Sequence, residues 1–255
     1  DLYEAKAALL ASKENTSLPV FCTMSFEENG RTFTGCTPES MAMVLEGLGA
    51  DAIGINCSLG PKELLPIVKR IKKWTNLPIM TQPNAGLPTI SFGEAIYDIS
   101  AKDFSTWVKE FIKEGVSIIG GCCGTTPGVI KELRELADNN KRVKREKVSY
   151  SAVCTPSKVV EIEGVKVIGE RINPTGKKLF KEALKNNDMD YILKQAIDQV
   201  EAGAEILDVN VGLPEIDEKD MMKRVIKEIQ GIIDTPLQID SSDINAIEVG
   251  LRAYN

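Results

Sequence analysis

The sequence contains no histidine among its 255 residues, and this absence excludes several classes of enzyme at once. Without imidazole there is no Ser-His or Cys-His nucleophile pair, no HExxH zinc site and no histidine general base. Any chemistry must therefore depend on thiols, carboxylates, amides or a bound cofactor.

Basic residues and long apolar runs are also scarce, and these shortages exclude further classes of partner. Basic residues are outnumbered, with 31 Lys and Arg against 37 Asp and Glu, which argues against a nucleic-acid-binding surface because such surfaces are usually basic. No apolar run approaches the ~20 residues that a membrane-spanning helix needs, and no charged and then apolar leader opens the chain. We therefore expect a soluble, cytoplasmic protein without nucleic-acid or membrane partners.

What the sequence does contain is a regular alternation of apolar and amphipathic segments. In the first half, the segments predicted as strands are residues 18–26, 52–56, 78–82 and 116–120. The segments predicted as helices are residues 3–11, 38–48, 61–74, 103–112 and 127–137. We expect Asp103 to cap the fourth helix. Strands this apolar are covered on both faces, as in half of a (β/α)8 barrel or in a doubly wound sheet.

The alternation is interrupted in the middle of the chain. Residues 138–147 are polar and carry five basic side chains, which we interpret as a solvated linker. The β-rich residues that follow predict a hairpin with its turn at Glu163-Gly164. Predicted strands at 206–210 and 237–240 alternate with helices again, so a second βα domain begins after the linker.

Three of the six cysteines follow predicted strands of the first half. Cys57 follows the second strand, Cys122 and Cys123 follow the fourth, and Asn84 follows the strand between them. Because the carboxyl ends of neighbouring parallel strands face one mouth, we expect these side chains in one pocket. Three thiolates suffice for a catalytic Zn²⁺ with an open fourth position, but buried structural thiols or a redox pair are alternatives that spacing alone leaves open. The remaining cysteines are interpreted as structural: Cys22, Cys36 and Cys154.

Motifs around these residues resemble the homocysteine S-methyltransferase family. They are GINCSLG at 54–60, QPNAGLP at 82–88 and GGCCGTTP at 120–127, in matching order and spacing over roughly residues 18–138. The resemblance implies a (β/α)8 barrel of which the second half is present, so residues that bind the amino acid group of homocysteine are not assigned. It also implies that Cys57, Cys122 and Cys123 hold Zn²⁺. The Asn84 amide is implied as the fourth ligand until the homocysteine thiol displaces it.

Polar side chains also follow the strands of the second half. The residues expected around that mouth are Glu170, Asp208, Asn210 and Asp240. Carboxylates and amides can pair with the donor-rich edge of a flat heterocycle. Asp and Asn at strand ends also commonly cap the next helix, so a single such residue would carry little weight.

Two motifs of this half, GERIN at 169–173 and LDVN at 207–210, resemble the pterin-binding domain shared by dihydropteroate synthases and folate or corrinoid methyltransferases. The resemblance covers roughly residues 160–255 and implies a second, incomplete barrel. It implies that Asp240 and Asn210 hydrogen-bond the pterin ring. The full set of pterin-binding residues that we expect is Glu170, Asn173, Asp208, Asn210 and Asp240.

Taken together, the two resemblances imply an α/β chain with portions of two (β/α)8 TIM barrels joined by a short linker. We expect residues 1–139 to be the C-terminal half of a homocysteine-binding barrel, 140–150 the linker, and 151–255 the N-terminal part of a pterin-binding barrel. We therefore interpret the chain as a fragment.

That arrangement is typical of the cobalamin-dependent methionine synthase family. It implies that a zinc-activated homocysteine thiolate takes a methyl group from methylcobalamin, carried on a module outside this chain, which 5-methyltetrahydrofolate then remethylates. A homocysteine methyltransferase using betaine or S-methylmethionine would not need the second site, and a methylenetetrahydrofolate reductase fusion would lack the GERIN motif. A non-catalytic zinc or redox module is the alternative from another class.

Overall fold

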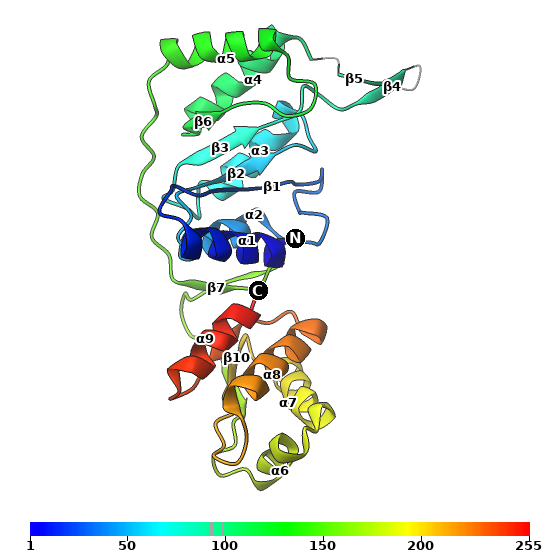
Figure 1. Ribbon diagram of the computed structural model, residues 1–255, viewed down its shortest axis with the longest axis vertical. Helices are drawn as coiled ribbons and strands as arrows, with labels where there is room; N and C mark the ends of the chain where they lie inside the picture. Colours follow the sequence, from blue (N-terminus) through cyan, green and yellow to red (C-terminus); the bar gives the residue numbers. More distant parts are fainter. Residues whose placement is uncertain (92–93, 98) are drawn as a thin grey trace. The chain divides into compact units, whose positions relative to one another are not determined.

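A computed structural model describes residues 1–91, 94–97 and 99–255 of the chain (Figure 1). The chain divides into two compact units, Asp1–Tyr150 and Ser151–Asn255. Each unit has a parallel sheet with helices packed against it, so the predicted α/β fold is confirmed. Within the described ranges, no helix is long and apolar enough to cross a membrane.

The sheet of the first unit has four parallel strands that follow one another in chain order (Figure 1). They are β1 (Phe21–Met24), β2 (Ala52–Asn56), β3 (Ile79–Gln82) and β6 (Ile118–Ile119). A doubly wound sheet reverses its strand order at a switch point, whereas strands of a (β/α)8 barrel keep it. The observed order is therefore the order of a barrel segment.

The helices of this unit pack against one another in the same sequential order. They are α1 (Leu2–Asn15), α2 (Pro38–Gly47), α3 (Pro61–Ile71), α4 (Ala101–Lys113) and α5 (Pro127–Asn139). Three of them begin with proline, whose fixed φ suits the first helical position and whose missing N–H needs no partner there. The apolar faces of α2 to α4 and the strands enclose a core that includes fully buried Met41, Phe104 and Phe111.

One local prediction for the first unit is corrected by the structure. The cap of α4 is Ser100, whose hydroxyl accepts from the Asp103 backbone N–H at 3.1 Å, and Asp103 lies inside the first turn. The Ser100 hydroxyl donates to the Asp103 carboxylate in return, so the predicted cap residue is the acidic partner of the cap. The segment before α4 also contains an antiparallel hairpin, β4 (Thr89–Ser91) with β5 (Glu94–Ile96).

The last residues of the predicted linker are held on the first unit. The Arg145 guanidinium donates to the carbonyl oxygens of Thr75, at 3.0 Å, and Leu77. The Tyr150 ring lies 4.9 Å from that of Trp74, and its hydroxyl donates to the Trp74 carbonyl oxygen. The segment that follows α5 is therefore anchored at its C-terminal end, although its role as a linker stays a prediction.

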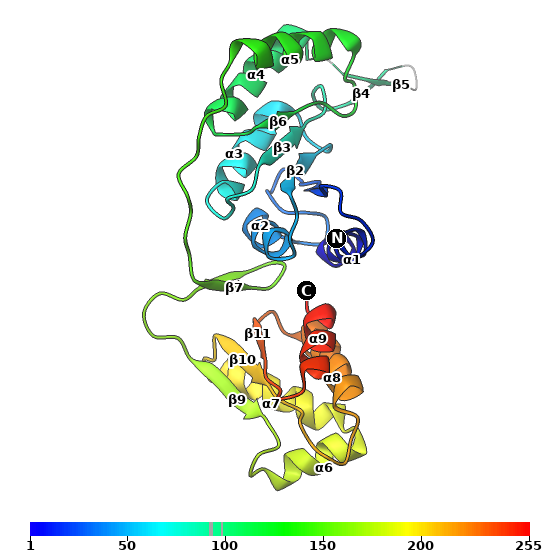
Figure 2. The ribbon, with the colours of Figure 1, turned by 60° about the vertical axis from the view of Figure 1, so that its left-hand side comes forward.

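The second unit repeats the sequential parallel arrangement in a three-stranded sheet (Figure 2). They are β9 (Ile168–Ile172), β10 (Ile206–Val209) and β11 (Leu237–Ile239). The helices, which pack in chain order, are α6 (Lys178–Asn186), α7 (Met189–Glu201), α8 (Glu218–Ile232) and α9 (Ile244–Ala253). Helix α6 was not predicted from the sequence.

A hairpin precedes this sheet, but its predicted turn is wrong. Strands β7 (Ala152–Cys154) and β8 (Val159–Glu161) pair across a turn in which the Thr155 N–H donates to the Lys158 carbonyl oxygen at 2.8 Å. The turn therefore contains Pro156-Ser157, two residues with strong turn preference. Glu163-Gly164 instead lies beyond β8, in the connection to β9.

Candidate functional site

The carboxyl edge of the first sheet gathers the predicted metal ligands on three successive turns. Cys57 directly follows β2, Asn84 lies two residues beyond β3, and the Cys122-Cys123 pair follows β6 after two glycines. Backbone hydrogen bonds join these turns: the Cys57 N–H donates to the Gln82 carbonyl oxygen, and the Cys122 N–H donates to that of Pro83, both at 2.9 Å. The turns therefore present their side chains to one place.

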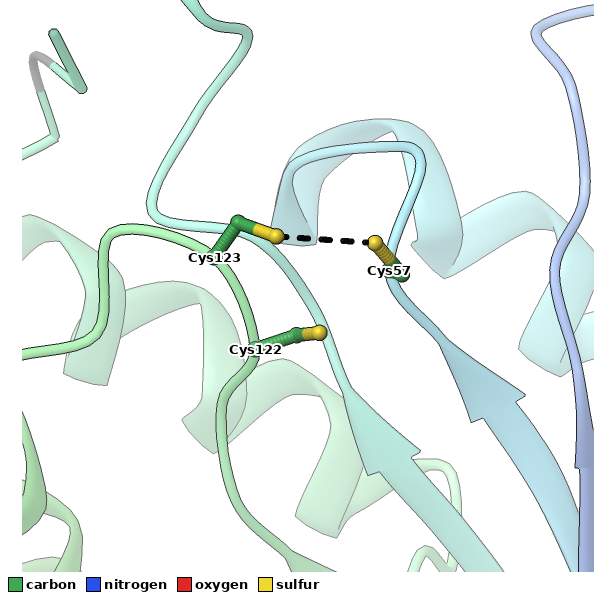
Figure 3. A group of neighbouring side chains, drawn as sticks. All are labelled: Cys57, Cys122 and Cys123. Carbon is green, nitrogen blue, oxygen red and sulfur yellow. Dashed lines mark hydrogen bonds between the residues drawn. The ribbon is translucent and has the colours of Figure 1, made fainter. Parts of the chain in front are cut away.

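The three cysteine sulfurs meet at this edge, within 4.8 Å of one another. Figure 3 shows Cys57 and Cys123 pointing toward each other from opposite turns, with Cys122 beside them. The Cys57 and Cys123 sulfurs are 3.7 Å apart. A tetrahedral Zn²⁺ with Zn–S bonds of about 2.3 Å places its sulfur ligands about 3.8 Å apart. The spacing and the soft donor set therefore fit a zinc ion.

The backbone at Cys57 is in an uncommon conformation. Cys57 has φ 60° and Ser58 has φ 57°, in the left-handed region that residues with a side chain rarely adopt. Such conformations cost on the order of 1 kcal/mol or more each and persist where the surroundings enforce them. The sequence gives no signal for this strain, because neither position is a glycine.

The pKa shifts of the thiols indicate that these groups compete for ionisation. The backbone N–H of Ser58 is the main cause that lowers the pKa of Cys57, with help from the neighbouring thiols and the Asn84 amide. Burial, together with the adjacent Cys57, raises the pKa of Cys122 to about 11. Two neighbouring thiolates therefore do not form readily without a cation, which a bound metal ion would supply.

Asn84 lies where the sequence analysis expected it, beside the sulfurs. Its side chain is buried, and its Oδ1 accepts a hydrogen bond from the Cys123 backbone N–H at 3.2 Å. The amide therefore also holds the turn that carries the vicinal cysteines. Its role as a fourth ligand stays a prediction.

Sequence reasoning missed Tyr97, which follows β5 and contacts the cysteine turn.

The remaining cysteines are placed apart from the cluster. Cys22 is half-buried in β1, Cys36 is buried with its thiol donating to the Thr37 carbonyl oxygen, and Cys154 is buried in β7. None of these six cysteines, all of which lie among the described residues, is in a disulfide bond.

The polar residues predicted for the second unit occupy the carboxyl ends of its three strands. Glu170 is in β9, Asp208 in β10, and Asn173, Asn210 and Asp240 each follow directly on a strand. The Asn210 amide donates to the Asp240 carboxylate at 2.9 Å, and the Asp240 backbone N–H donates to the Val209 carbonyl oxygen at 3.0 Å. The structure thus joins Asn210 and Asp240 into one pair.

Asp208 is the buried member of this group. It is 5% exposed, and its Oδ1 has no hydrogen-bond partner among the residues that the structure describes. Burial raises the pKa of its carboxyl, and the nearby charges of Asp240 and Glu170 raise it further. A buried acceptor without a donor favours a ligand that brings an N–H group.

The other two predicted residues are engaged differently. Glu170 is exposed and forms an ion pair with Lys177, whose ammonium group also donates to the Glu170 carbonyl oxygen. The Asn173 side chain accepts from the Thr175 backbone N–H at 2.9 Å, so its described contact shapes its own loop. Sequence reasoning missed Lys177, which could have been noticed as a cation in the glycine loop beside an acidic mouth.

Comparison with protein families matches residues 1–137 to homocysteine S-methyltransferase and residues 169–255 to pterin binding enzyme. Methionine synthases of Mycobacterium tuberculosis and Mycobacterium leprae are 33% and 32% identical to the chain and align with 99% of it. The chain spans 22% of the length of each. The oxidized form of the Escherichia coli homocysteine methyltransferase MmuM aligns with a TM-score of 0.44 at 21% identity, covering 53% of this chain and 42% of that one. Both resemblances expected from the motifs are confirmed by the family matches.

Proposed function

The chain belongs to the homocysteine S-methyltransferase family, and on that basis we propose that it takes part in making methionine by methyl transfer to homocysteine. The proposed activity is that of a 5-methyltetrahydrofolate–homocysteine S-methyltransferase. The observation that carries the proposal is the convergence of three cysteine sulfurs within 4.8 Å at the carboxyl edge of the first sheet.

Zn²⁺ is the cofactor that we propose for the first unit. Cys57, Cys122 and Cys123 would hold it through their sulfurs, and Asn84 would occupy the fourth position until substrate arrives. Bound Zn²⁺ supplies positive charge that lowers the pKa of a coordinated thiol, so that homocysteine is a thiolate near neutral pH. An all-sulfur protein ligand set leaves a place that suits a sulfur substrate.

The second unit is proposed to bind 5-methyltetrahydrofolate. Asp240 and Asn210 would hydrogen-bond the pterin ring, since an ionised carboxylate can accept two N–H bonds from one edge of a heterocycle. The other residues proposed for this site are Glu170, Asn173 and Asp208. The methyl group would pass from the folate to homocysteine by way of cobalamin on a module outside residues 1–255, in the cytoplasm.

The second unit also bears on the choice of methyl donor. A homocysteine methyltransferase that uses betaine or S-methylmethionine has no need of a pterin-binding unit. Here the acidic residues stand at the ends of three consecutive strands, and residues 169–255 match the pterin binding enzyme family. These observations favour a folate donor.

The test is whether homocysteine binding depends on the metal and releases a proton. We expect the reduced chain to bind about one equivalent of zinc, and the zinc-loaded chain to release about one proton for each homocysteine thiol bound near pH 7. Calorimetry in buffers of different ionisation enthalpy measures this release. Methionine, whose sulfur carries no proton, is the matched control ligand. Equal binding of homocysteine with and without zinc would contradict the proposal.

A further inference from the structure

Strand β9 departs from regular pairing with β10 opposite Asp208. Between two paired positions, β10 has one residue, Asp208, whereas β9 has two, Glu170 and Arg171. The extra residue makes this a β-bulge, a feature that is frequent beside active sites because it changes the direction of side chains. The bulge therefore lies among residues proposed for the pterin site, Glu170 and Asp208.

The peptide group between Glu170 and Arg171 is bonded on both sides to side chains. Its carbonyl oxygen, which belongs to Glu170, accepts a hydrogen bond from the Lys177 ammonium group at 2.8 Å. Its N–H, which belongs to Arg171, donates to the Oε1 atom of Gln199 at 2.6 Å. Because backbone polar groups need partners wherever the strand ladder is interrupted, these two side chains support the bulge.

Gln199 is held in the orientation that this contact needs. The residue is in α7 and is 8% exposed, and its Nε2 atom donates to the Gln195 carbonyl oxygen at 2.9 Å. Both ends of the buried amide are therefore bonded, which offsets the cost of removing it from water. A Cβ added to Gly169 would lie only 2.7 Å from the Gln199 Oε1 atom, so glycine at position 169 leaves room for the amide.

We propose that Gln199 is a positioning residue of the second unit, whose amide holds the bulge that places Glu170 and Arg171 opposite Asp208. This inference rests on the proposed function, because it assumes that Glu170 and Asp208 belong to the pterin site. Lys177 supports the same peptide group and also pairs with the Glu170 carboxylate at 2.9 Å. A site whose backbone is fixed before the ligand arrives loses less binding free energy to ordering.

The experiment compares two substitutions of Gln199 in the whole chain. Gln199→Met keeps the length of the side chain but removes the acceptor, so we expect 5-methyltetrahydrofolate to bind about 10-fold more weakly. Gln199→Glu keeps an oxygen that accepts in either protonation state, so its affinity should stay within about 2-fold of the unaltered chain. Calorimetry measures both affinities. Amide hydrogen exchange at Arg171 should become faster in Gln199→Met only.

Gln230→Met is the matched control. Gln230 is a helix glutamine of the same unit, and its Oε1 atom likewise accepts from a backbone N–H, that of Asn255 at 2.7 Å. It lies in α8 and does not contact the bulged peptide, whose two partners are Lys177 and Gln199. The substitution should lower stability and leave folate affinity unchanged, which separates a loss of positioning from a general loss of stability.

Undiminished folate affinity in Gln199→Met would overturn the positioning role and leave the proposed function intact. An equal loss in Gln199→Met and Gln199→Glu would also overturn it, because the acceptor would then not be the cause. Should Gln199→Met fail to fold, Lys177→Met removes the other partner of the same peptide group and should weaken folate binding about 10-fold; undiminished affinity there would overturn the role of the bulge. An unaltered chain that binds no 5-methyltetrahydrofolate would contradict the proposed function itself, and the role of Gln199 would fall with it.

Discussion

Each unit of this chain has a group of polar residues at the carboxyl ends of its parallel strands, here called its mouth. The two mouths differ in how their charges are compensated. In the first unit, the pKa shifts of Cys57 and Cys122 come from a backbone amide, burial and the neighbouring thiols. In the second unit, two of the three acidic groups have partners, since Lys177 pairs with Glu170 and Asn210 donates to Asp240, whereas the Oδ1 atom of buried Asp208 has no hydrogen-bond partner among the described residues. The first mouth is short of positive charge, whereas the second is largely compensated.

This difference indicates what each mouth is suited to bind. Thiols that cannot all ionise together favour a metal cation, which supplies the missing charge. Carboxylates that already have donors have no need of a cation, and their remaining acceptor capacity suits a neutral ligand with N–H groups. Both mouths lie at the carboxyl ends of consecutive parallel strands, so the residues placed at those ends decide the chemistry and the fold does not.

The largest expected effect is that of Cys57→Ser. This substitution should disrupt metal binding in the first unit and leave ligand binding by the second unit unchanged. We expect zinc affinity to fall more than about 100-fold, because losing only an outer hydrogen bond to a ligand costs about 10- to 100-fold. Affinity for 5-methyltetrahydrofolate should stay the same. Zinc content and chelator competition on the reduced protein, with calorimetry for the folate, measure the two effects.

Cys22→Ser is the control for this variant, because Cys22 is a half-buried thiol in β1 that lies outside the sulfur cluster. It should keep about one equivalent of zinc. A Cys57→Ser chain that also keeps a full equivalent would show that the sulfur cluster is not the metal centre.

The second effect, Asp240→Asn, tests the other mouth. The substitution keeps the size of the side chain but removes the charge that accepts from Asn210 and, as proposed, from the pterin. Hydrogen bonds to charged groups contribute about 1.5–3 kcal/mol, so we expect 5-methyltetrahydrofolate to bind about 10- to 100-fold more weakly. Zinc affinity should not change. Asp198→Asn, which breaks an exposed ion pair with Lys194 on α7, is the control, and undiminished folate affinity in Asp240→Asn would contradict the pterin site.

Asp208→Asn tests how the buried carboxylate of the second unit affects the stability of that unit. The pKa of Asp208 is raised above its ordinary value of 3.8, so its ionisation is less favourable in the folded than in the unfolded chain. Its contribution to stability is therefore full below the unfolded-state pKa and is lost as pH rises through the folded-state pKa. We expect Asp208→Asn to raise the free energy of unfolding of the second unit by about 1 kcal/mol at pH 7, with less gain near pH 4.

The measurement is denaturant unfolding at both pH values. Asp198→Asn serves again as control, because that carboxylate is exposed on a helix. If the gain of Asp208→Asn were equal at pH 4 and pH 7, the ionised Asp208 would not be the cause. Loss of folate affinity together with the gain in stability would indicate that the buried charge is kept for binding.

The features of the two sites that could be predicted from the sequence are those that depend on residues close together in the chain. Alternating apolar segments with glycine and proline boundaries indicate the strands, and β2 was predicted at its observed bounds, Ala52–Asn56. Residues that directly follow a strand, such as Cys57 and Asp240, are placed at the sheet edge by the strand itself. The gathering of the three sulfurs needed only the additional rule that parallel strands end together.

Features that depend on one specific contact, and not on hydrophobic periodicity, were missed. Tyr97 contacts the turn at Gly124 from the end of a hairpin whose path no periodicity indicates, and Lys177 reaches Glu170 across a loop. The cap of α4 was misplaced because Ser100 and Asp103 are both good cap residues, and the reciprocal hydrogen bonds between them decide which one precedes the helix. The left-handed conformation of Cys57 is likewise imposed by the hydrogen bonds around it and not by its own preference.

The smallest expected effects concern two helix caps, one in each unit. They test whether the two units are stabilised independently of each other. Ser100 accepts from the Asp103 N–H at the start of α4, and Asp217 accepts from the Asp220 N–H at the start of α8, both at 3.1 Å. Ser100→Ala and Asp217→Ala should each cost about 1 kcal/mol. Because the chain divides into compact units between residues 150 and 151, we expect faster amide hydrogen exchange only in the unit that carries the substitution. Faster exchange in α8 caused by Ser100→Ala would show that the units are energetically coupled. The proposed metal site and the proposed pterin site would then belong to one cooperative structure.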